Sequence, residues 1–171
     1  MVADVGCGDG FYTIPLARHL APNGRVLAID IDDDALSKLS QGLTKEGLKN
    51  VEIIKGAEDD PMLPDARLDA VLIVNAYHEM TKPKPMLRHV LAALKPGALL
   101  VLMEGISDIR EKKSRDEQIK HHQLAPGFAK QEIAAAGFDI VEVRDPFTDR
   151  PPDLDEKSHW WVIIARKPTK V

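Results

Sequence analysis

Apolar runs and helix-like periodicities alternate along this chain. Short apolar runs cover residues 2–5, 25–30, 51–55, 68–74 and 98–104. Strands of a parallel sheet are buried on both faces and read as apolar runs, and the helices that connect them lie between these runs in sequence. The run over 68–74 is typical of a central parallel strand. The pattern predicts an α/β fold with a parallel sheet covered by helices on both faces.

The segments between these runs carry apolar side chains at helical spacing. A stripe of leucines follows the second run, where Asp32 or Asp33 can cap the helix and Gly47 can end it. Pro126 is expected to start a late helix that ends at Gly137. The other helices are expected from about residue 12 or 13, over about 83–94, and from about 114 onward.

Two further strands are expected at the C-terminal end, over residues 138–144 and 159–166. A loop rich in Pro and Asp joins them, so they can pair antiparallel. Trp160 and Trp161 are neighbours in the last strand, and successive side chains of a strand face opposite sides. One of these rings is therefore expected in the core.

Composition narrows the class of protein. With 171 residues and 44% hydrophobic content, the chain is long enough for one domain, and we assign residues 1–171 to it. The net charge of −4 gives no sign of a nucleic-acid partner, and no apolar run approaches membrane-spanning length. The single cysteine, Cys7, cannot form an internal disulfide, and no signal peptide opens the chain, so a cytoplasmic location is expected. Oligomeric state is not indicated.

A glycine-rich segment, Val2 to Phe11 (VADVGCGDGF), joins the first strand to the first helix. Glycine accepts positive φ and lets a ligand approach the backbone, and the first amides of the following helix are left free for that ligand. The spacing is G-x-G-x-G, whereas a dinucleotide site needs G-x-G-x-x-G with its third glycine at the position of Phe11. A nucleotide-type ligand without a pyrophosphate fits better.

The segment Asp4 to Gly10 (DVGCGDG) resembles motif I of the class I S-adenosylmethionine-dependent methyltransferases. Residues 26–30 (VLAID) resemble the second strand of that family with its ribose-binding acid, and residues 94–101 (LKPGALLV) resemble its fifth strand and the turn before it. The resemblance implies a three-layer, Rossmann-like sheet of seven strands in the order 3-2-1-4-5-7-6, with strand 7 antiparallel. It also implies S-adenosylmethionine as cofactor and transfer of its methyl group.

Members of this family usually carry helices before the first strand, which cover the cofactor. The sequence here begins at the strand itself, so an open and weak cofactor site is expected. The methyl acceptor is expected to be a small molecule. Two alternatives stay open, namely a nicotinamide-dependent oxidoreductase and a non-catalytic module that binds a cofactor or a partner.

Ligands of open α/β sheets lie outside the carboxyl ends of the strands, at the point where the winding reverses. This rule brings the segments after strands 1 to 4 together, and the resemblance gives their residues roles. Asp30 is expected to accept hydrogen bonds from two ribose hydroxyls, with Ile31 beside it, rather than to cap the following helix, for which Asp32, Asp33 and Asp34 are available. The residues expected to hold the cofactor at the glycine loop are Asp4, Gly6, Cys7, Gly8 and Gly10.

Other assignments of site residues also have a competing interpretation. Asp4 holds the methionine end of the cofactor or forms a local pair near the turn, and Cys7 is a small turn residue rather than a nucleophile. After the third strand, the Ala57 amide and the carboxylate of Glu58 or Asp59 contact the adenine, or these acids belong to a solvated loop. The family often has an Asp at the position of Ala57, so this contact is the least supported.

The segment after the fourth strand carries the most reactive side chains. Asn75 and Ala76 fall where the family brackets the methionine moiety, while Tyr77 and His78 are expected to face the acceptor as catalytic residues. His78 has a pKa suited to a general base, although both side chains also occur as packing residues at a helix start. His121 and His122 are adjacent on an expected helix and point in different directions, so no metal site is predicted.

Overall fold

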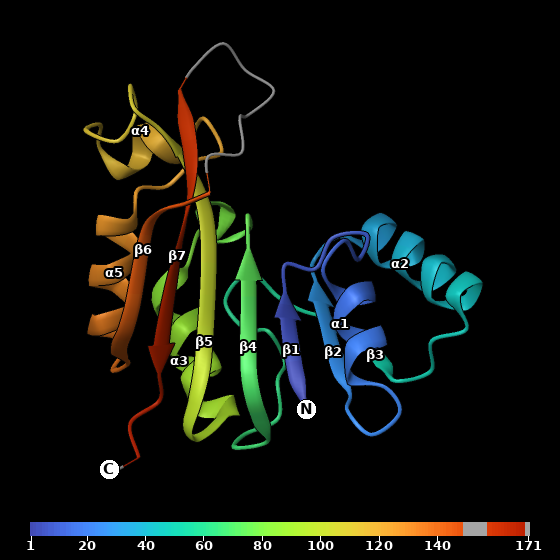
Figure 1. Ribbon diagram of the computed structural model, residues 1–171. Helices are drawn as coiled ribbons and strands as arrows, with labels where there is room; N and C mark the ends of the chain where they lie inside the picture. Colours follow the sequence, from blue (N-terminus) through green and yellow to red (C-terminus); the bar gives the residue numbers. More distant parts are fainter. Residues whose placement is uncertain (149–156, 170–171) are drawn as a thin grey trace.

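A seven-stranded sheet forms the frame of the protein in the computed structural model, which describes residues 1–148 and 157–169 (Figure 1). Its strands follow the order β3-β2-β1-β4-β5-β7-β6, as the family resemblance implied. Only β7 runs antiparallel to its neighbours β5 and β6 among the described strands. The strands are β1 (Val2–Val5), β2 (Val26–Asp30), β3 (Val51–Lys55), β4 (Leu68–Val74), β5 (Leu94–Ser107), β6 (Asp139–Thr148) and β7 (Ser158–Arg166).

The helices begin and end close to the residues expected from the sequence. They are α1 (Thr13–Leu20), α2 (Asp33–Glu46), α3 (Pro83–Ala93), α4 (Arg115–Ile119) and α5 (Pro126–Ala135), with a short 3-10 helix η1 (Tyr77–Glu79). Asp32 caps α2 by accepting hydrogen bonds from the amides of Asp34 and Ala35, and Gly47 ends it at a φ of 68°. Local capping chemistry therefore sets the ends of α2.

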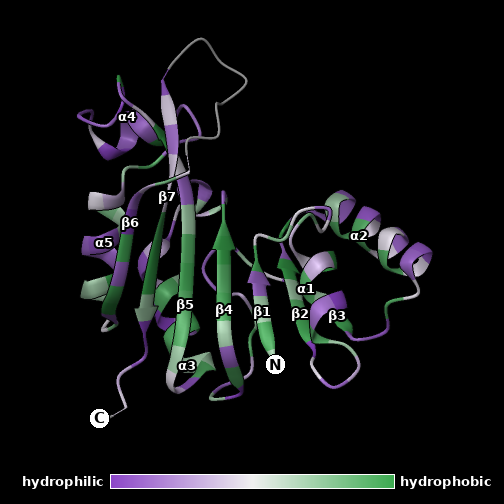
Figure 2. Cartoon of the chain, in the orientation of Figure 1, coloured by the Kyte–Doolittle hydropathy of each residue, from purple (hydrophilic) through white to green (hydrophobic). Residues whose placement is uncertain are grey.

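Two apolar clusters show that the helices cover both faces of the sheet. The larger cluster joins α3 and α5 to one face of the strands, and the smaller one joins α2 to the other face. Along β2, Leu27 and Ile29 belong to the first cluster and Ala28 to the second. The central strands are predominantly hydrophobic, whereas β6 and the helices are mixed (Figure 2).

Two strands are longer than the sequence predicted. β5 begins at Leu94, where it pairs with β4, and ends at Ser107, where it still pairs with β7. The Lys95-Pro96-Gly97 signal suggested a later start, but long-range pairing extends the strand on both sides of it. β6 continues to Thr148, and the Pro- and Asp-rich loop after it falls largely at residues 149–156, outside the described residues.

The prediction that one tryptophan of the last strand enters the core is confirmed. Trp161 is fully buried and its indole Nε1 donates to the Leu124 carbonyl at 2.7 Å, whereas Trp160 is half-buried on the opposite face. Among the described residues, no helix is long and apolar enough to cross a membrane.

Candidate functional site

The glycine loop between β1 and α1 adopts the conformations that its sequence requires. Gly6, Gly8 and Gly10 all have positive φ, at 77°, 54° and 98°. A Cβ on Gly6 would lie 2.4 Å from the Cβ of Ala76. The loops after β1 and β4 can therefore pack this closely only because residue 6 has no side chain. A Cβ on Gly8 would meet nothing within 4 Å, so this part of the backbone faces open space where a ligand fits.

Asp30, at the end of β2, is bound to this loop. Its Oδ2 accepts the Gly8 amide at 2.8 Å, and its Oδ1 accepts the amides of Ile31 at 2.7 Å and Asp32 at 3.0 Å. An ionised carboxylate offers about four acceptor positions. Three backbone amides therefore leave Oδ2 with room for one further donor, which is fewer than the two ribose hydroxyls expected from the sequence.

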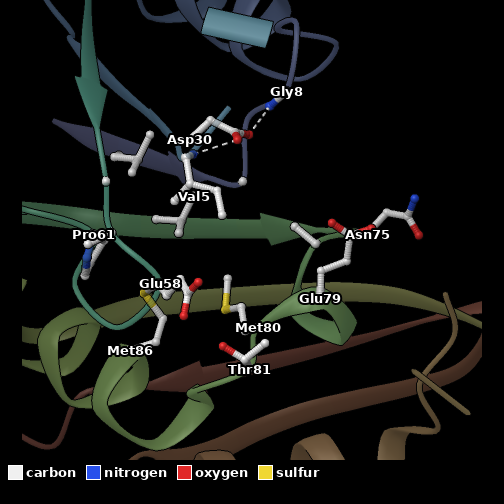
Figure 3. A pocket seen from close by; sticks show the side chains of 16 residues that line it. Val5, Gly8, Asp30, Glu58, Pro61, Asn75, Glu79, Met80, Thr81 and Met86 are labelled. Atoms are coloured by element: carbon white, nitrogen blue, oxygen red, sulfur yellow. Dashed lines mark hydrogen bonds between the residues drawn. The ribbon is translucent and has the colours of Figure 1, made fainter. Parts of the chain in front are cut away.

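A cavity of about 320 Å³ opens beside Asp30, between the ends of the first four strands (Figure 3). Most of its lining is apolar, and the carboxylates of Asp30, Glu58 and Glu79 are the acidic groups in it. Its size lies in the range of small-molecule sites. The expected site residues that line it are Gly6, Gly8, Asp30, Ile31, Ala57, Glu58, Asn75 and Ala76.

The remaining expected residues of the glycine loop lie outside the lining of this cavity. Asp4 is buried beneath the loop, and its Oδ2 accepts a hydrogen bond from the Thr13 hydroxyl at 2.6 Å. Burial raises the pKa of Asp4 to about 6, although the Thr13 hydrogen bond opposes this rise. The local pair that the sequence left open is thus present. Gly10 packs against Leu39 of α2, where a Cβ would lie 2.4 Å from Cδ1.

Cys7 occupies a buried position in the same loop and packs in the cluster on the α2 side. Burial, followed by the nearby carboxylates of Asp4 and Asp30, raises the pKa of its thiol to about 12. The thiol stays protonated at neutral pH, so it is a poor nucleophile. This geometry agrees with the interpretation of Cys7 as a small turn residue.

The loop after β3 uses some of its groups internally. The Ala57 amide, expected to contact an adenine nitrogen, donates to the Asp60 carbonyl at 2.8 Å. Glu58 lines the cavity, whereas Asp59 lies 3.3 Å from the Lys82 ammonium. Glu58 is therefore the acid of this loop that a ligand in the cavity can meet.

Beyond β4, the chain turns sharply before η1. Asn75 has a φ of 50°, an uncommon value for a residue with a side chain, and Ala76 follows against Gly6. Tyr77 was expected to face the acceptor, but its ring is fully buried and its hydroxyl donates to Glu132 of α5 at 2.7 Å. Burial and the Glu132 charge raise the pKa of Tyr77. Its apolar ring packs in the core instead of facing the cavity.

His78 is buried next to a carboxylate that the sequence analysis did not single out. Its Nδ1 lies 2.7 Å from Oε2 of Glu104, which is itself fully buried near the end of β5. The other oxygen of Glu104 accepts the amides of Tyr77 at 2.6 Å and His78 at 3.2 Å. Burial lowers the pKa of His78, but the hydrogen bond and charge of Glu104, together with Glu79, outweigh it and raise the pKa.

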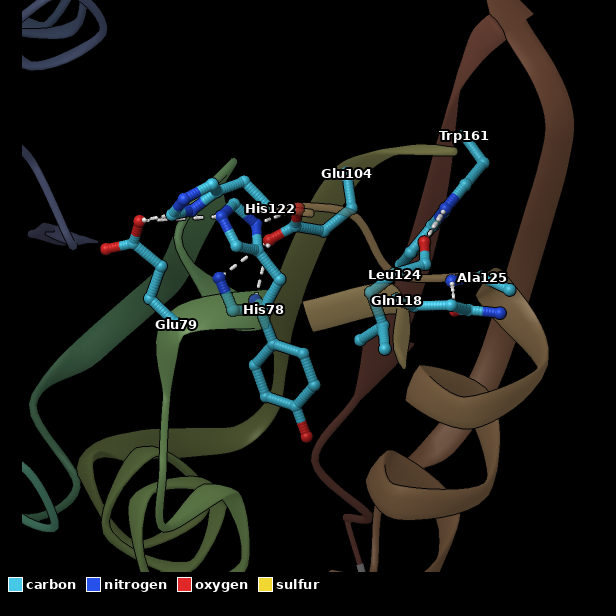
Figure 4. Close-up of polar contacts among 9 residues, drawn as sticks. His78, Glu79, Glu104, Gln118, His122, Leu124, Ala125 and Trp161 are labelled. Carbon is cyan, nitrogen blue, oxygen red and sulfur yellow. Dashed lines mark hydrogen bonds and ion pairs between the residues drawn. The ribbon is translucent and has the colours of Figure 1, made fainter. Parts of the chain in front are cut away.

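Two further side chains lie near the Nε2 side of the His78 ring (Figure 4). Glu79 Oε1 lies 3.6 Å from His78 Nε2 and 3.2 Å from His122 Nδ1. The rings of His78 and His122 are edge-on, with their centroids 5.6 Å apart. His122 was expected on a helix surface, but it follows α4 in a turn with a φ of 54°. The sequence contained one signal for this cluster. Glu104 is an acidic residue in an otherwise apolar strand, which indicates a buried carboxylate that needs a partner.

Comparison with known proteins agrees with this geometry. A family model described as a methyltransferase domain matches residues 2–97. A demethylmenaquinone methyltransferase of Listeria monocytogenes is 30% identical over 103 residues, which cover 60% of this chain and 44% of that protein. A protein of the same description from Geobacillus stearothermophilus is 31% identical over 101 residues, covering 59% and 43%. The chain thus spans less than half the length of these curated relatives.

Solved structures extend the likeness over nearly the whole chain. The crystal structure of an S-adenosylmethionine-dependent methyltransferase from Aquifex aeolicus superposes with a TM-score of 0.78 at 25% sequence identity. The match covers 96% of this chain and 80% of that one. The seven-stranded topology described above is therefore shared with an S-adenosylmethionine-dependent enzyme.

Proposed function

This chain belongs to the methyltransferase domain family of the class I fold, whose family model matches more than half of it, and on this premise we propose that it transfers a methyl group from S-adenosylmethionine to a small-molecule acceptor. We treat residues 1–171 as one such domain. The observation that carries the proposal is the convergence of Gly6, Gly8 and Asp30 on one apolar cavity at the carboxyl ends of the central strands.

The cavity fits this cofactor in size and in charge. A volume of about 320 Å³ and apolar walls suit an adenosine moiety, and Gly8 leaves open space where a side chain would otherwise stand. The cofactor carries a positive sulfonium and a positive ammonium group. The carboxylates of Asp30, Glu58 and Glu79 line the same cavity, so its charge complements such a ligand.

Each wall of the cavity has a proposed part in binding. The Oδ2 atom of Asp30 would accept a ribose hydroxyl, and Ile31 would pack beside the nucleoside. Glu58 would take the adenine amino group, with the Ala57 backbone beside it. Gly6, Gly8, Asn75 and Ala76 would enclose the methionine end, above the buried residues Asp4, Cys7 and Gly10 that shape the loop.

When bound, S-adenosylmethionine supplies a methyl group already activated by its positive sulfur. The protein then has to orient the acceptor and exclude water, because alignment of two reactants provides a large share of the rate. Glu79 and Met80 follow β4 and line the cavity, so they mark the side from which the acceptor approaches. His78 stands behind Glu79 with its Nε2 directed at it, and Tyr77 acts as a positioning residue through its packing.

The acceptor class rests on the relatives. The curated relatives named above are methyltransferases for demethylmenaquinone, which is a small molecule, and this supports a small-molecule acceptor here. The formal net charge of −4 agrees with an acceptor other than nucleic acid. The lone, unpaired Cys7 agrees with a cytoplasmic location, which we include in the proposal.

Calorimetric titration tests the cofactor directly. We expect S-adenosylhomocysteine to bind the chain and NADH not to bind it, and the reverse order would contradict the proposal. Asp30→Ala should weaken S-adenosylhomocysteine binding roughly 10–100-fold, because a hydrogen bond to a charged group is lost. Asp65→Ala, at an exposed acid outside the cavity lining, is the matched control and should bind as the unmodified chain does.

Circular dichroism of both variants separates a binding defect from unfolding. Asp30→Asn keeps one acceptor oxygen for the loop amides and gives a second measurement if the alanine variant is unfolded. An Asp30 variant that is folded and binds S-adenosylhomocysteine with unchanged affinity would refute the role assigned to this carboxylate.

A further inference from the structure

Three side chains of metal-ligating type meet at the edge of the cofactor cavity. His78, Glu79 and His122 each offer one ligand atom, and these atoms all lie within 4.8 Å of one another. Two of the separations are 3.6 Å and 3.2 Å, both measured to Oε1 of Glu79. Ligands about 2.0–2.1 Å from a tetrahedral zinc ion are about 3.4 Å apart, so the observed spacing is close to that of a coordination sphere.

The His78 ring is fixed in the orientation that a metal ligand needs. Its Nδ1 is held at 2.7 Å by Glu104, and both residues are buried. A carboxylate that holds one ring nitrogen of a ligating histidine is the usual outer shell of a metal site, because it sets the tautomer and raises the basicity of the other nitrogen. Here that other nitrogen, Nε2, points toward Glu79 and His122 (Figure 4).

The atoms around Nε2 of His78 suit a cation. This nitrogen lies 3.6 Å from Oε1 of Glu79, and the same oxygen lies 3.2 Å from Nδ1 of His122. A divalent cation placed between these three atoms would be attracted by the Glu79 carboxylate and would bind a lone pair of each imidazole.

The turn that carries His122 is built around a buried side chain. The Nε2 of Gln118 donates to the carbonyls of Arg110, Glu111 and Lys113 at 3.0, 3.0 and 3.1 Å, and its Oε1 accepts the Ala125 amide at 2.7 Å. Gln118 is fully buried, so it fixes the path of the chain on both sides of His122. The ligand side chain itself remains exposed and free to adjust, as does that of Glu79.

We propose that His78 Nε2, the Glu79 carboxylate and His122 bind a divalent transition-metal ion of the class that prefers imidazole, such as Zn²⁺, Co²⁺ or Fe²⁺. Two imidazoles and one carboxylate favour these ions over Mg²⁺ and Ca²⁺, which prefer oxygen ligands. This proposal differs from the sequence analysis, which predicted no metal site.

Three protein ligands leave at least one coordination position open. Glu79 also lines the cofactor cavity, so an ion at this cluster would face the space where the acceptor approaches. A hydroxyl group of the acceptor would complete the coordination through its oxygen, and the ion would lower the pKa of that hydroxyl group. This second step depends on the proposed function, whereas metal binding itself does not.

The test uses the tag-free chain, freed of metal with a chelator and titrated with Zn²⁺ by calorimetry. We expect one ion to bind per chain, and His122→Ala to weaken binding at least about tenfold. His121→Ala is the matched control, because its imidazole is one position away and lies beside Glu117 outside the cluster. It should bind Zn²⁺ as the unmodified chain does. Co²⁺ should give a visible absorption band that His122→Ala reduces.

Each other outcome contradicts the proposal. Absence of Zn²⁺ binding means that hydrogen bonds and ion pairs alone hold the cluster together, and equal losses in His121→Ala and His122→Ala mean adventitious binding at surface histidines. Unchanged affinity in His122→Ala removes that residue from the site. A parallel titration with S-adenosylhomocysteine distinguishes this failure from that of the proposed function, because cofactor binding by the metal-free chain does not require the ion.

Discussion

The two sides of the cavity are built by different means. On the β1–β3 side, the groups at the cavity are chiefly backbone: the glycine loop and the amides that the Asp30 carboxylate accepts. On the β4–β5 side, they are side chains from separate segments, joined through Glu104. The β1–β3 side is determined by short segments of sequence, and the β4–β5 side depends on tertiary contacts.

This difference determines how each side responds to substitution. A backbone site loses its shape when a side chain is added, and it keeps its shape when an exposed side chain is removed. A side-chain network behaves in the opposite way, since removal of one buried member leaves its partners without hydrogen bonds. Substitutions on the two sides should therefore produce distinguishable effects.

The largest effect is expected at Glu104. Glu104→Ala leaves the amides of Tyr77 and His78 and the His78 ring nitrogen without their acceptor. We expect the free energy of unfolding to fall by about 3–5 kcal/mol, as when one partner of a buried charged pair is removed. Urea denaturation measures this loss.

Glu142→Ala on β6 is the control for Glu104→Ala, because it also removes a glutamate from a strand but at an exposed position paired with Arg144. It should leave the urea midpoint unchanged. Equal midpoints for the two variants would show that Glu104 does not hold the β4–β5 side together.

The next effect is expected at Gly6 and tests the β1–β3 side. Gly6→Ala places a Cβ 2.4 Å from that of Ala76 and does so at a φ of 77°. The clash and the strained backbone together should lower the free energy of unfolding by about 2–4 kcal/mol and weaken S-adenosylhomocysteine binding.

Gly47→Ala separates strain from clash, because Gly47 has a φ of 68° and its Cβ would meet nothing within 4 Å. This control should lose only about 1 kcal/mol, and it should bind S-adenosylhomocysteine normally. If Gly6→Ala cost no more than Gly47→Ala, the contact between the loops after β1 and β4 would be unimportant for stability.

A gain in stability is expected at Asp4, the one buried side-chain charge of the glycine loop. Its pKa is raised from 3.8 to about 6 in the folded chain, so above pH 6 the carboxylate is charged in both states and its burial costs roughly 3 kcal/mol. As the pH falls from 6 toward 3.8, the folded chain takes up the proton first and the cost disappears.

Asp4→Asn should therefore raise the free energy of unfolding by about 2–3 kcal/mol at pH 8, with the advantage lost near pH 4. The amide oxygen can still accept the Thr13 hydroxyl. Urea denaturation at several pH values follows this trend, and Thr13→Val, which removes the donor and keeps the charge, should have the opposite sign at pH 8. A pH-independent difference would contradict the burial of an ionised Asp4.

The sequence predicted the turn of the glycine loop and the ends of α2 because their determinants are local. Glycine spacing, the acid at the end of the second strand, and the Asp32 and Gly47 caps lie within short segments whose chemistry fixes their conformation. The strand order came from the family resemblance. The lengths of β5 and β6 did not follow, since their ends depend on pairing with β7.

The cluster around His78 could not be predicted from the sequence, because its members are far apart along the chain. Glu104 is 26 positions from His78, and His122 is 43 positions from Glu79. Periodicity placed His122 on a helix, whereas the chain leaves α4 and turns around Gln118 before reaching it. Nothing in a local pattern reveals that these side chains meet, because tertiary contacts between η1, β5 and the turn after α4 bring them together.

The smallest effect is expected at Trp161, which connects the turn after α4 to the sheet. Trp161→Phe keeps an aromatic ring in the core and removes the hydrogen bond from Nε1 to the Leu124 carbonyl, two residues after His122. An unsatisfied buried carbonyl should cost about 1–2 kcal/mol in urea denaturation. Trp160→Phe, on the opposite face, is the control and should lose less stability.

Zn²⁺ affinity should fall slightly in Trp161→Phe alone, because only that change loosens the segment that positions His122. Equal stability of the two variants would mean that this turn is held by Gln118 without help from the sheet.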